Sequence, residues 1–476
     1  MPISEFVRTP TRLSQQLLLL AGVSLALVSC DSDLQTSSTP TTGTPVVVPS
    51  TGAGGGTSNS SLSLQVGDGQ ITLTEGEDAI SVPVSVTRSA ASTGVVELSV
   101  TGASASDENQ MTATFSQAQL AADESSTSLS LQLAIDALPI QAQTRSLTVT
   151  ASIDGSPVLS TDVDIAVTPT NRPDVYLLVG QSNMVGFSED ASKLASTGGL
   201  DAPNARIKQL NVTGNDGENF ATAADFTTAA SVFNEGMPVS PAVDPLHDGY
   251  DTNIEGKSGQ RIGPALSFAK RALLDTTAEI VLVPAAWSDT GFCKRDTNRL
   301  PGVGWNATAK NNAALAGTLL YERAVLRANV ALAETDGVLR AILWHQGEAD
   351  SDDAGCAETY ADNLMELVTA LRTNIDQDAR GAVARGPNAE LPFIVGTMSM
   401  GSDAFSDQTP FSDLKQLVDD THRNIANLIP LSDVVNNDDL IPDAYPCGEG
   451  SCIHFGAAAY REMGNRYYQQ LFELMQ

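Results

Sequence analysis

The sequence predicts an all-β sandwich followed by an α/β domain that has a mainly parallel sheet with helices on both faces. Between residues 61 and 169, short runs alternate apolar and polar residues, which is the period of a half-buried strand. From about residue 172, apolar strands alternate with helical patterns. The 476 residues, 42% of them hydrophobic, are enough for about two to four domains.

The charge of the chain excludes some classes of protein. The formal net charge is -31, and only 17% of the residues are charged. A nucleic-acid-binding protein needs a basic face to displace counterions, so this class is disfavoured. Adhesion to anionic lipid by charge is disfavoured for the same reason.

Residues 1–30 have the pattern of a bacterial lipoprotein signal. Arg8 and Arg12 precede an apolar run over 17–28, which is shorter than the ~20 residues that span a bilayer. The run ends Leu-Val-Ser-Cys at Cys30, which resembles the lipobox of these signals. We expect cleavage before Cys30, lipidation of Cys30, and an exported lipoprotein at the periplasmic face of a membrane or at the cell surface. The alternative is an ordinary signal peptide with a chance cysteine.

A tether and the sandwich follow the signal. Residues 31–60 are mostly Ser, Thr, Gly and Pro, which predicts a flexible linker. Residues 61–169 predict a small sandwich that resembles immunoglobulin-like modules in its pattern alone. This region has no Trp and few aromatic residues that would stack on sugars, so a spacer or docking role is favoured over glycan binding. The strands expected in it lie over 71–73, 80–86, 95–100, 129–133 and 147–151.

The α/β domain, residues 172–476, should place its chemistry directly after its strands. Parallel sheets bind ligands at the carboxyl ends of their strands. We expect strands over 174–179, 280–283, 338–344 and 393–395, and helices over 263–274, 311–334, 360–371 and 456–474.

The first segment of interest, Gly-Gln-Ser-Asn-Met over 180–184, follows the first of these strands. A serine in a glycine-flanked turn after a buried strand suits a nucleophile, and neighbouring backbone N–H groups can bind an oxyanion. We therefore identify Ser182 as a candidate nucleophile. Alternatively, Ser182 caps the helix that follows.

The second segment, Trp-His-Gln-Gly-Glu-Ala-Asp over 344–350, ends another strand. Gln346 can donate a hydrogen bond to an oxyanion, and Glu348 can orient a histidine. The alternative is that Glu348 and Asp350 cap the next helix.

The third segment, Cys-Ile-His-Phe over 452–455, precedes the last helix and supplies a candidate base, His454. The chain has three other histidines. His247 lies in a loop, His345 is held beside Trp344, and His422 falls on a helix that looks amphipathic and solvated.

Four cysteines beyond Cys30 suit an oxidising compartment. The economical pairing joins Cys293 to Cys356 and Cys447 to Cys452, although four cysteines allow three connectivities. A zinc site would need Cys-x-x-Cys pairs or added His spacing, which the sequence lacks. We therefore expect no metal and no cofactor.

Together, the three segments resemble the sialate O-acetylesterase-like branch of the SGNH hydrolases, which includes the acetylxylan esterases of carbohydrate esterase family six. The resemblance covers about 172–476 and implies a three-layer α/β/α fold and metal-free deacetylation of sugars. It carries over Ser182 as nucleophile, His454 as base, and the Ser182 N–H and the Gln346 amide as oxyanion donors. The supporting residues expected around them are Gly180, Gln181, Asn183 and His345.

The chain departs from this family twice. Many relatives have Asp three residues before the His, where this chain has Ser451. Some relatives use the Glu of Gln-Gly-Glu, so we expect Glu348 to complete the triad, with Glu449 and Asp443 as weaker candidates. Relatives also tend to have a Gly-Gly-Thr turn where this chain reads Trp-Ser-Asp-Thr-Gly over 287–291, which leaves the second oxyanion donor open.

The expected function is removal of acetyl groups from carbohydrates such as acetylxylan or O-acetyl sialic acid. One alternative is an esterase of the same fold that acts on other short acyl esters. Another is a non-catalytic surface protein with a degenerate hydrolase domain.

Overall fold

The computed structural model describes fifteen stretches of the chain. They are residues 62–67, 70–75, 78–89, 94–102, 111–122, 124–135, 141–186, 201–211, 238–247, 262–293, 303–307, 318–375, 391–399, 412–440 and 453–475. The signal and tether expected over 1–60, with Cys30, lie outside the described residues. Within these stretches, no helix combines the length and the apolar character needed to cross a membrane.

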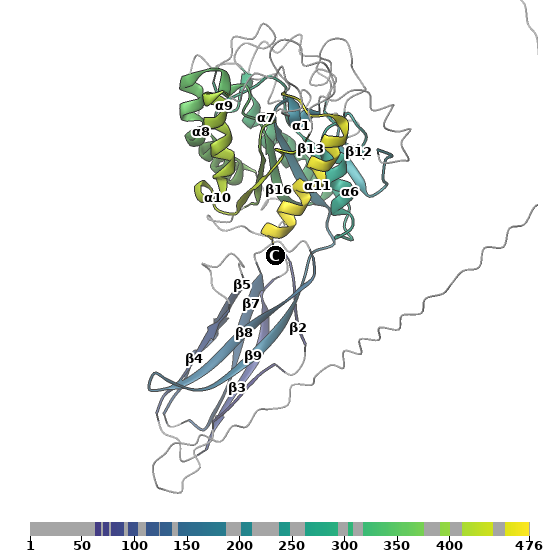
Figure 1. Ribbon diagram of the computed structural model, residues 1–476. Coiled ribbons are helices and arrows are strands. Elements are labelled where there is room, and N and C mark those ends of the chain that lie inside the picture. Colours follow the sequence, from purple (N-terminus) through teal and green to yellow (C-terminus); the bar gives the residue numbers. More distant parts are fainter. Residues whose placement is uncertain are drawn as a thin grey trace, which may run out of the picture. The chain divides into compact units, whose positions relative to one another are not determined.

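The first folded part consists of two sheets packed on one core (Figure 1). The sheets form because alternate residues point inward: on β3, for example, Val82, Val84 and Val86 are buried while their neighbours are more exposed. One sheet has the order β1 (Leu62–Val66), β3 (Ile80–Arg88), β7 (Ser126–Ile135), β5 (Met111–Phe115). The other has the order β2 (Ile71–Thr74), β9 (Ser156–Thr168), β8 (Gln143–Ile153), β4 (Val96–Thr101), β6 (Gln119–Leu120).

The second part is built on a seven-stranded sheet. Its order is β12 (Val239–Pro241), β11 (Ile207–Leu210), β13 (Ile280–Pro284), β10 (Asp174–Gly180), β16 (Val338–His345), β17 (Phe393–Gly396), β18 (Ser432–Val435). All neighbouring strands are parallel except β12, which is antiparallel to β11. A separate pair, β14 (Val303–Gly304) and β15 (Thr318–Leu319), is also parallel.

Helices cover both faces of this sheet because its strands are apolar on both sides. Val175 and Val179 of β10 belong to the core cluster that includes α7 and α8, whereas Tyr176 and Leu178 belong to the cluster that includes α6 and α11. The helices are α1 (Ser182–Val185), α6 (Ala265–Ala272), α7 (Leu320–Thr335), η3 (Asp350–Asp352), α8 (Ala354–Asn374), α9 (Asp413–Arg423), α10 (Ile425–Leu428) and α11 (Ala457–Leu474).

The order of the strands determines where a ligand site can form. From β10 the chain goes to one side, to β11 and β13, and then crosses to β16 on the other side. This is a topological switch point, where open α/β sheets bind ligands beyond the carboxyl ends of their strands. Ser182 and Gln346 directly follow the two strands that meet there.

The expected mixed α/β architecture is confirmed, and the expected strands of the parallel sheet are all present to within a residue or two. Two helix boundaries differ. The helix expected from residue 311 begins at Leu320, after the short strand β15, and residues 311–317 lie outside the described part. The helix expected over 360–371 is longer and extends over Ala354–Asn374.

Candidate active site

Ser182 lies where strand β10 meets the end of β16. Gly180 ends β10 with a φ of 129°, a conformation that favours glycine. A Cβ at Gly180 would lie 2.1 Å from the carbonyl oxygen of His345, so glycine permits the two strand ends to approach. The N–H of Gln181 donates to that carbonyl at 2.8 Å. Ser182, the first residue of α1, is thereby held beside the turn that follows β16.

Ser182 and His454 are brought together although 272 residues separate them. The distance between His454 Nε2 and Ser182 Oγ is 2.9 Å, within the reach that a base needs to take a hydroxyl proton. Ser182 is buried. Its backbone N–H is at the start of a helix, where amides have no intrahelical acceptor, so it can donate to an oxyanion.

Asn183, the residue after Ser182, is fully buried and connects two other parts of the site. Its Nδ2 donates to Glu348 Oε1 at 2.6 Å and to the carbonyl of Ile453 at 2.8 Å. Its Oδ1 accepts from the hydroxyl of Tyr460 at 2.7 Å. The expected supporting residue Asn183 therefore contacts the turn after β16, the segment before His454, and helix α11.

The carboxylate of Glu348 faces Asn183 and makes no hydrogen bond to His454. Oε1 accepts from Asn183, and Oε2 is buried with no hydrogen-bond partner in the described part of the chain. Burial raises the pKa of Glu348, and the charge of Lys415 partly opposes this. The assignment of Glu348 as the acid stays a prediction, and this geometry favours an indirect connection to His454.

Gln346 is fully buried in the floor of the site, and its amide is already engaged. Its Nε2 lies 2.8 Å from Asp350 Oδ2, 3.0 Å from the carbonyl of Thr290 and 3.2 Å from Gln181 Oε1. Three acceptors surround two N–H groups, so an oxyanion would have to displace one of them. Gln346 thus joins three segments of the site, and its role as an oxyanion donor stays a prediction.

His345 is buried behind the site and is neutral. Burial lowers its pKa to about 3. Its Nδ1 lies 3.1 Å from the hydroxyl of Tyr467, which itself donates to the carbonyl of Trp344 at 2.6 Å. Because that hydroxyl has one proton, this arrangement favours the tautomer in which His345 Nδ1 is the donor. His345 therefore supports the end of β16 rather than exchanging protons.

Asp350 was overlooked as a functional residue by the sequence reasoning, which considered it only as a helix cap. It is buried, and its carboxylate accepts from the N–H groups of Phe292 and Cys293 at 3.0 and 3.1 Å as well as from Gln346. A Cβ at Gly291 would lie 2.6 Å from its Oδ2, so glycine is needed for this approach. The actual cap of α8 is Asp353, whose side chain accepts from the N–H of Cys356 at 3.1 Å.

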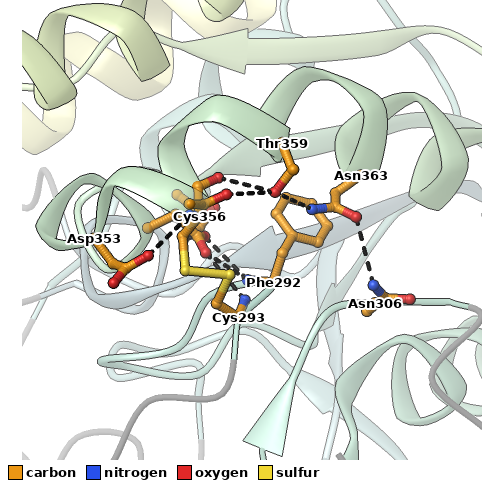
Figure 2. Close-up of a disulfide and its surroundings, with 10 residues drawn as sticks. Phe292, Cys293, Asn306, Asp353, Cys356, Thr359 and Asn363 are labelled. Atoms are coloured by element: carbon orange, nitrogen blue, oxygen red, sulfur yellow. Dashed lines mark hydrogen bonds between the residues drawn. A yellow bond between two sulfur atoms is a disulfide. The ribbon is translucent and has the colours of Figure 1, made fainter. Parts of the chain in front are cut away.

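The predicted disulfide between Cys293 and Cys356 is confirmed (Figure 2). It joins the segment after β13 to the first turn of α8. Because the N–H of Cys293 also donates to Asp350, the disulfide braces the loop that holds Gln346 in place. The same region contains a possible metal-ligand group, Cys293, Asp350 and Cys356, but both sulfur atoms are committed to the disulfide.

We expect the double variant Cys293→Ser/Cys356→Ser to lose turnover at temperatures where the core stays folded. Removing the disulfide, which links two residues 63 positions apart, should also lower the free energy of unfolding by about 4 kcal/mol, because the unfolded chain is no longer constrained by the link. Turnover and urea unfolding measured on the same samples test this. Turnover unchanged in the folded double variant would show that the disulfide does not support the site.

The expectation for His422 was wrong. This residue is fully buried on α9, and its Nε2 lies 2.9 Å from the hydroxyl of Tyr360, which donates to the carbonyl of Gln346 at 3.0 Å. His247 is also buried, and its Nε2 accepts from the N–H of Ala286 at 3.2 Å. Neither histidine contacts Ser182 among the described hydrogen bonds, which leaves His454 in the position of the base.

Several predicted residues cannot be placed. The second disulfide and the alternative acids stay predictions, because the residues concerned lie outside the described part of the chain: Cys447, Cys452, Glu449, Asp443 and Ser451.

The turn over 287–291, where the chain departs from the Gly-Gly-Thr pattern, contains one unusual backbone conformation. Asp289 has a φ of 60°, a left-handed conformation that Asp tolerates better than most residues.

The chain is similar in sequence and in structure to known proteins. The chain is 33% identical over 138 residues to the probable carbohydrate esterase At4g34215 of Arabidopsis thaliana, and the match spans 28% of this chain and 44% of that protein. The solved structure of that protein matches with a TM-score of 0.42 and 20% identity, covering 63% of this chain and 97% of the other. The crystal structure of NanS matches with a TM-score of 0.44 and 18% identity, and the match covers 63% of this chain and 96% of the NanS chain.

The model of one protein family, described as carbohydrate esterase, sialic acid-specific acetylesterase, matches residues 172–473. The match contains all three segments singled out above and the whole seven-stranded sheet. The chain therefore belongs to the sialic acid-specific acetylesterase family of carbohydrate esterases and is a carboxylic ester hydrolase.

Proposed function

We propose that this enzyme removes acetyl groups from acetylated carbohydrates, with Ser182 as nucleophile and His454 as general base. The observation that carries the proposal is the 2.9 Å contact between His454 Nε2 and Ser182 Oγ at the carboxyl ends of β10 and β16. Membership in a family of carbohydrate acetylesterases supports acetyl as the acyl group and carbohydrates as the class of substrate.

The reaction proceeds in two steps. Ser182 Oγ attacks the acetyl carbonyl carbon while His454 Nε2 takes the hydroxyl proton. The ester bond then breaks, the sugar oxygen leaves with the proton from His454, and the acetyl group stays on Ser182. Water attacks the acetyl-enzyme and gives its proton to His454, acetate leaves, and Ser182 recovers its proton.

The negative oxygen formed in each step needs hydrogen-bond donors. The N–H of Ser182 supplies one, and Gln346 supplies a second if its amide exchanges an existing acceptor for the oxyanion. Loss of one such donor costs about 10²–10³ in rate in comparable enzymes. The amide already lies between Thr290 and Asp350, so the exchange needs only a local movement.

Acetate release from a panel of substrates tests the proposal. The panel contains acetylxylan, O-acetyl sialic acid, acetylated peptidoglycan and a small chromogenic acetate. Hydrolysis of a sugar acetate with a higher kcat/KM than the chromogenic ester supports a carbohydrate substrate. Hydrolysis of the chromogenic acetate without hydrolysis of any acetylated glycan would favour an esterase for other short acyl esters, and no hydrolysis at all would favour the non-catalytic surface protein.

We further propose that the enzyme is exported and anchored to a membrane through a lipid on Cys30. The support is the apolar run that ends at this cysteine. In a bacterial host, labelled palmitate should be incorporated into the wild-type protein and not into Cys30→Ala, which should also leave the membrane fraction. Equal labelling of both proteins would refute the anchor.

A further inference from the structure

Asn183 has a hydrogen-bonding environment that fixes its orientation. Its two N–H groups face the acceptors Glu348 Oε1 and the carbonyl of Ile453, and its oxygen faces the donor Tyr460. A flipped amide would place its oxygen against two acceptors, so only one orientation satisfies all three partners. A buried side chain held in this way is rigid.

The carbonyl that Asn183 binds is immediately before the candidate base. Ile453 precedes His454, and Asn183 follows Ser182. One amide therefore connects the backbone next to the nucleophile with the backbone next to the base. The connection therefore lies next to both members of the 2.9 Å contact between Ser182 Oγ and His454 Nε2.

We propose that Asn183 is a positioning residue that holds His454 within reach of Ser182, with Glu348 as its buried anchor. The proposal rests on the proposed function, because it assumes that these two residues perform the proton transfer. A displacement of about 1 Å between reacting groups can cost about 10²-fold in rate. Glu348 acts on the base through Asn183 and needs no contact with His454.

The geometry of Glu348 supports the role of anchor. Its Oε1 is the acceptor of the 2.6 Å bond from Asn183, and hydrogen bonds to an ionised acceptor are the stronger ones. Burial raises the pKa of this carboxyl, and the charge of Lys415, a residue of α9, opposes that rise. The amide is thus held by the turn after β16 on one side and holds the Ile453 carbonyl on the other.

The first test is the kinetics of Asn183→Ala and Asn183→Asp. For Asn183→Ala we expect kcat to fall about 10²-fold with KM changed less than about threefold. The rate at which a phosphonate ester modifies Ser182 should fall in parallel, since it reports activation of the nucleophile. Asn183→Asp replaces the NH2 group by one oxygen, which then faces the acceptors Glu348 Oε1 and the Ile453 carbonyl without a proton to donate, so its loss should be larger.

Asn465→Ala is the matched control. Asn465 is an exposed residue of α11, and its variant should keep the wild-type kcat and phosphonate reactivity. A purely structural role of Asn183 would lower the midpoint of thermal unfolding without slowing the phosphonate reaction of the folded fraction. A folded Asn183→Ala with wild-type kcat and phosphonate reactivity would overturn the proposal.

The second test asks whether Glu348 acts through Asn183. If it does, the kcat of the double variant Glu348→Ala/Asn183→Ala should be no lower than the kcat of the slower single variant. If the two act independently, their losses multiply, and the proposed anchoring is wrong. Should the Asn183 variants fail to fold, Glu348→Ala against Glu348→Gln decides, because only glutamine keeps an acceptor for Asn183.

The proposed function and the positioning role of Asn183 can be refuted separately. Wild-type activity in Ser182→Ala would overturn the proposed function and this inference with it. An inactive Ser182→Ala beside a fully active Asn183→Ala would leave the function standing and remove only the positioning role.

Discussion

Ser182→Ala is expected to lower kcat for acetyl ester hydrolysis by on the order of 10⁶-fold, because alanine has no atom that can form the acyl-enzyme. His454→Ala should lose a similar factor, since its Nε2 is the group within 2.9 Å of the Ser182 hydroxyl. The double variant should be no slower than either single variant, because the two residues act as one unit. Steady-state rates with a chromogenic acetate and with an acetylated sugar measure all three.

The controls for this prediction separate chemistry from folding. Circular dichroism and the thermal unfolding midpoint should show that each variant stays folded, and Ser156→Ala, an exposed serine of β9, should keep full activity. Residual activity of Ser182→Ala above about one hundredth of the wild type would mean that another group attacks the ester. Losses that multiply in the double variant would show that Ser182 and His454 do not act together.

The positions of Ser182 and His454 could be predicted because they depend on where the backbone leaves the strands of the sheet. The apolar runs identify the parallel strands, and the turns after such strands meet at one edge of the sheet. Glycine at position 180 added a local reason for a tight approach. The end of a strand can be predicted without knowing which way each side chain points, so the sequence was sufficient to place these two residues at the same edge of the sheet.

The roles of Glu348 and Gln346 depended on side-chain partners that the sequence does not reveal. Glu348 bonds to Asn183, 165 residues away, and Gln346 bonds to the carbonyl of Thr290, 56 residues away. Each has several possible partners at the same strand edge. Which one is chosen follows from packing and from competition among acceptors, so spacing alone could not decide between them.

The error over His422 has a different cause. Asp419, His422 and Arg423 have the spacing of one helical face, and three polar residues on one face predict exposure. On α9, Asp419 is instead buried, where it accepts from the N–H of Met398 at 2.8 Å and from Arg423 at 2.7 Å. Asp419 and His422 are therefore covered by polar partners of the protein while Arg423 stays exposed, and the periodicity of the sequence cannot distinguish such partners from water.

Glu348→Gln is expected to keep kcat within about tenfold of the wild type. Its amide oxygen can still accept from Asn183, so the connection to the Ile453 carbonyl is preserved. A carboxylate bonded directly to His454 would behave differently, because loss of the acid in comparable triads costs about 10⁴ in kcat. We expect a loss of about 10³–10⁴-fold in either Glu449→Gln or Asp443→Asn.

The same variant has a pH signature. Burial raises the pKa of Glu348 above its usual value of 4.5, so the folded protein holds this proton more tightly than the unfolded chain. In the interval between those two pKa values the folded state binds more protons, and the free energy of unfolding falls as the pH rises. Glu348→Gln should lack this contribution, so its stability relative to the wild type should increase from acid to neutral pH. Denaturant unfolding at a series of pH values measures the difference.

Kinetics and stability together identify the acid. If Glu348 only anchors Asn183, Glu348→Gln stays active and gains relative stability at neutral pH, while Glu348→Ala loses turnover as Asn183→Ala does. If Glu348 instead bonds directly to His454, Glu348→Gln should lose about 10³–10⁴-fold in kcat. The limb of the pH profile of kcat/KM that reports the base should also shift to lower pH, because the carboxylate no longer stabilises the imidazolium of His454. That result, with Glu449→Gln and Asp443→Asn both near wild type, would restore the direct triad and place a movement of the Glu348 side chain within the catalytic cycle.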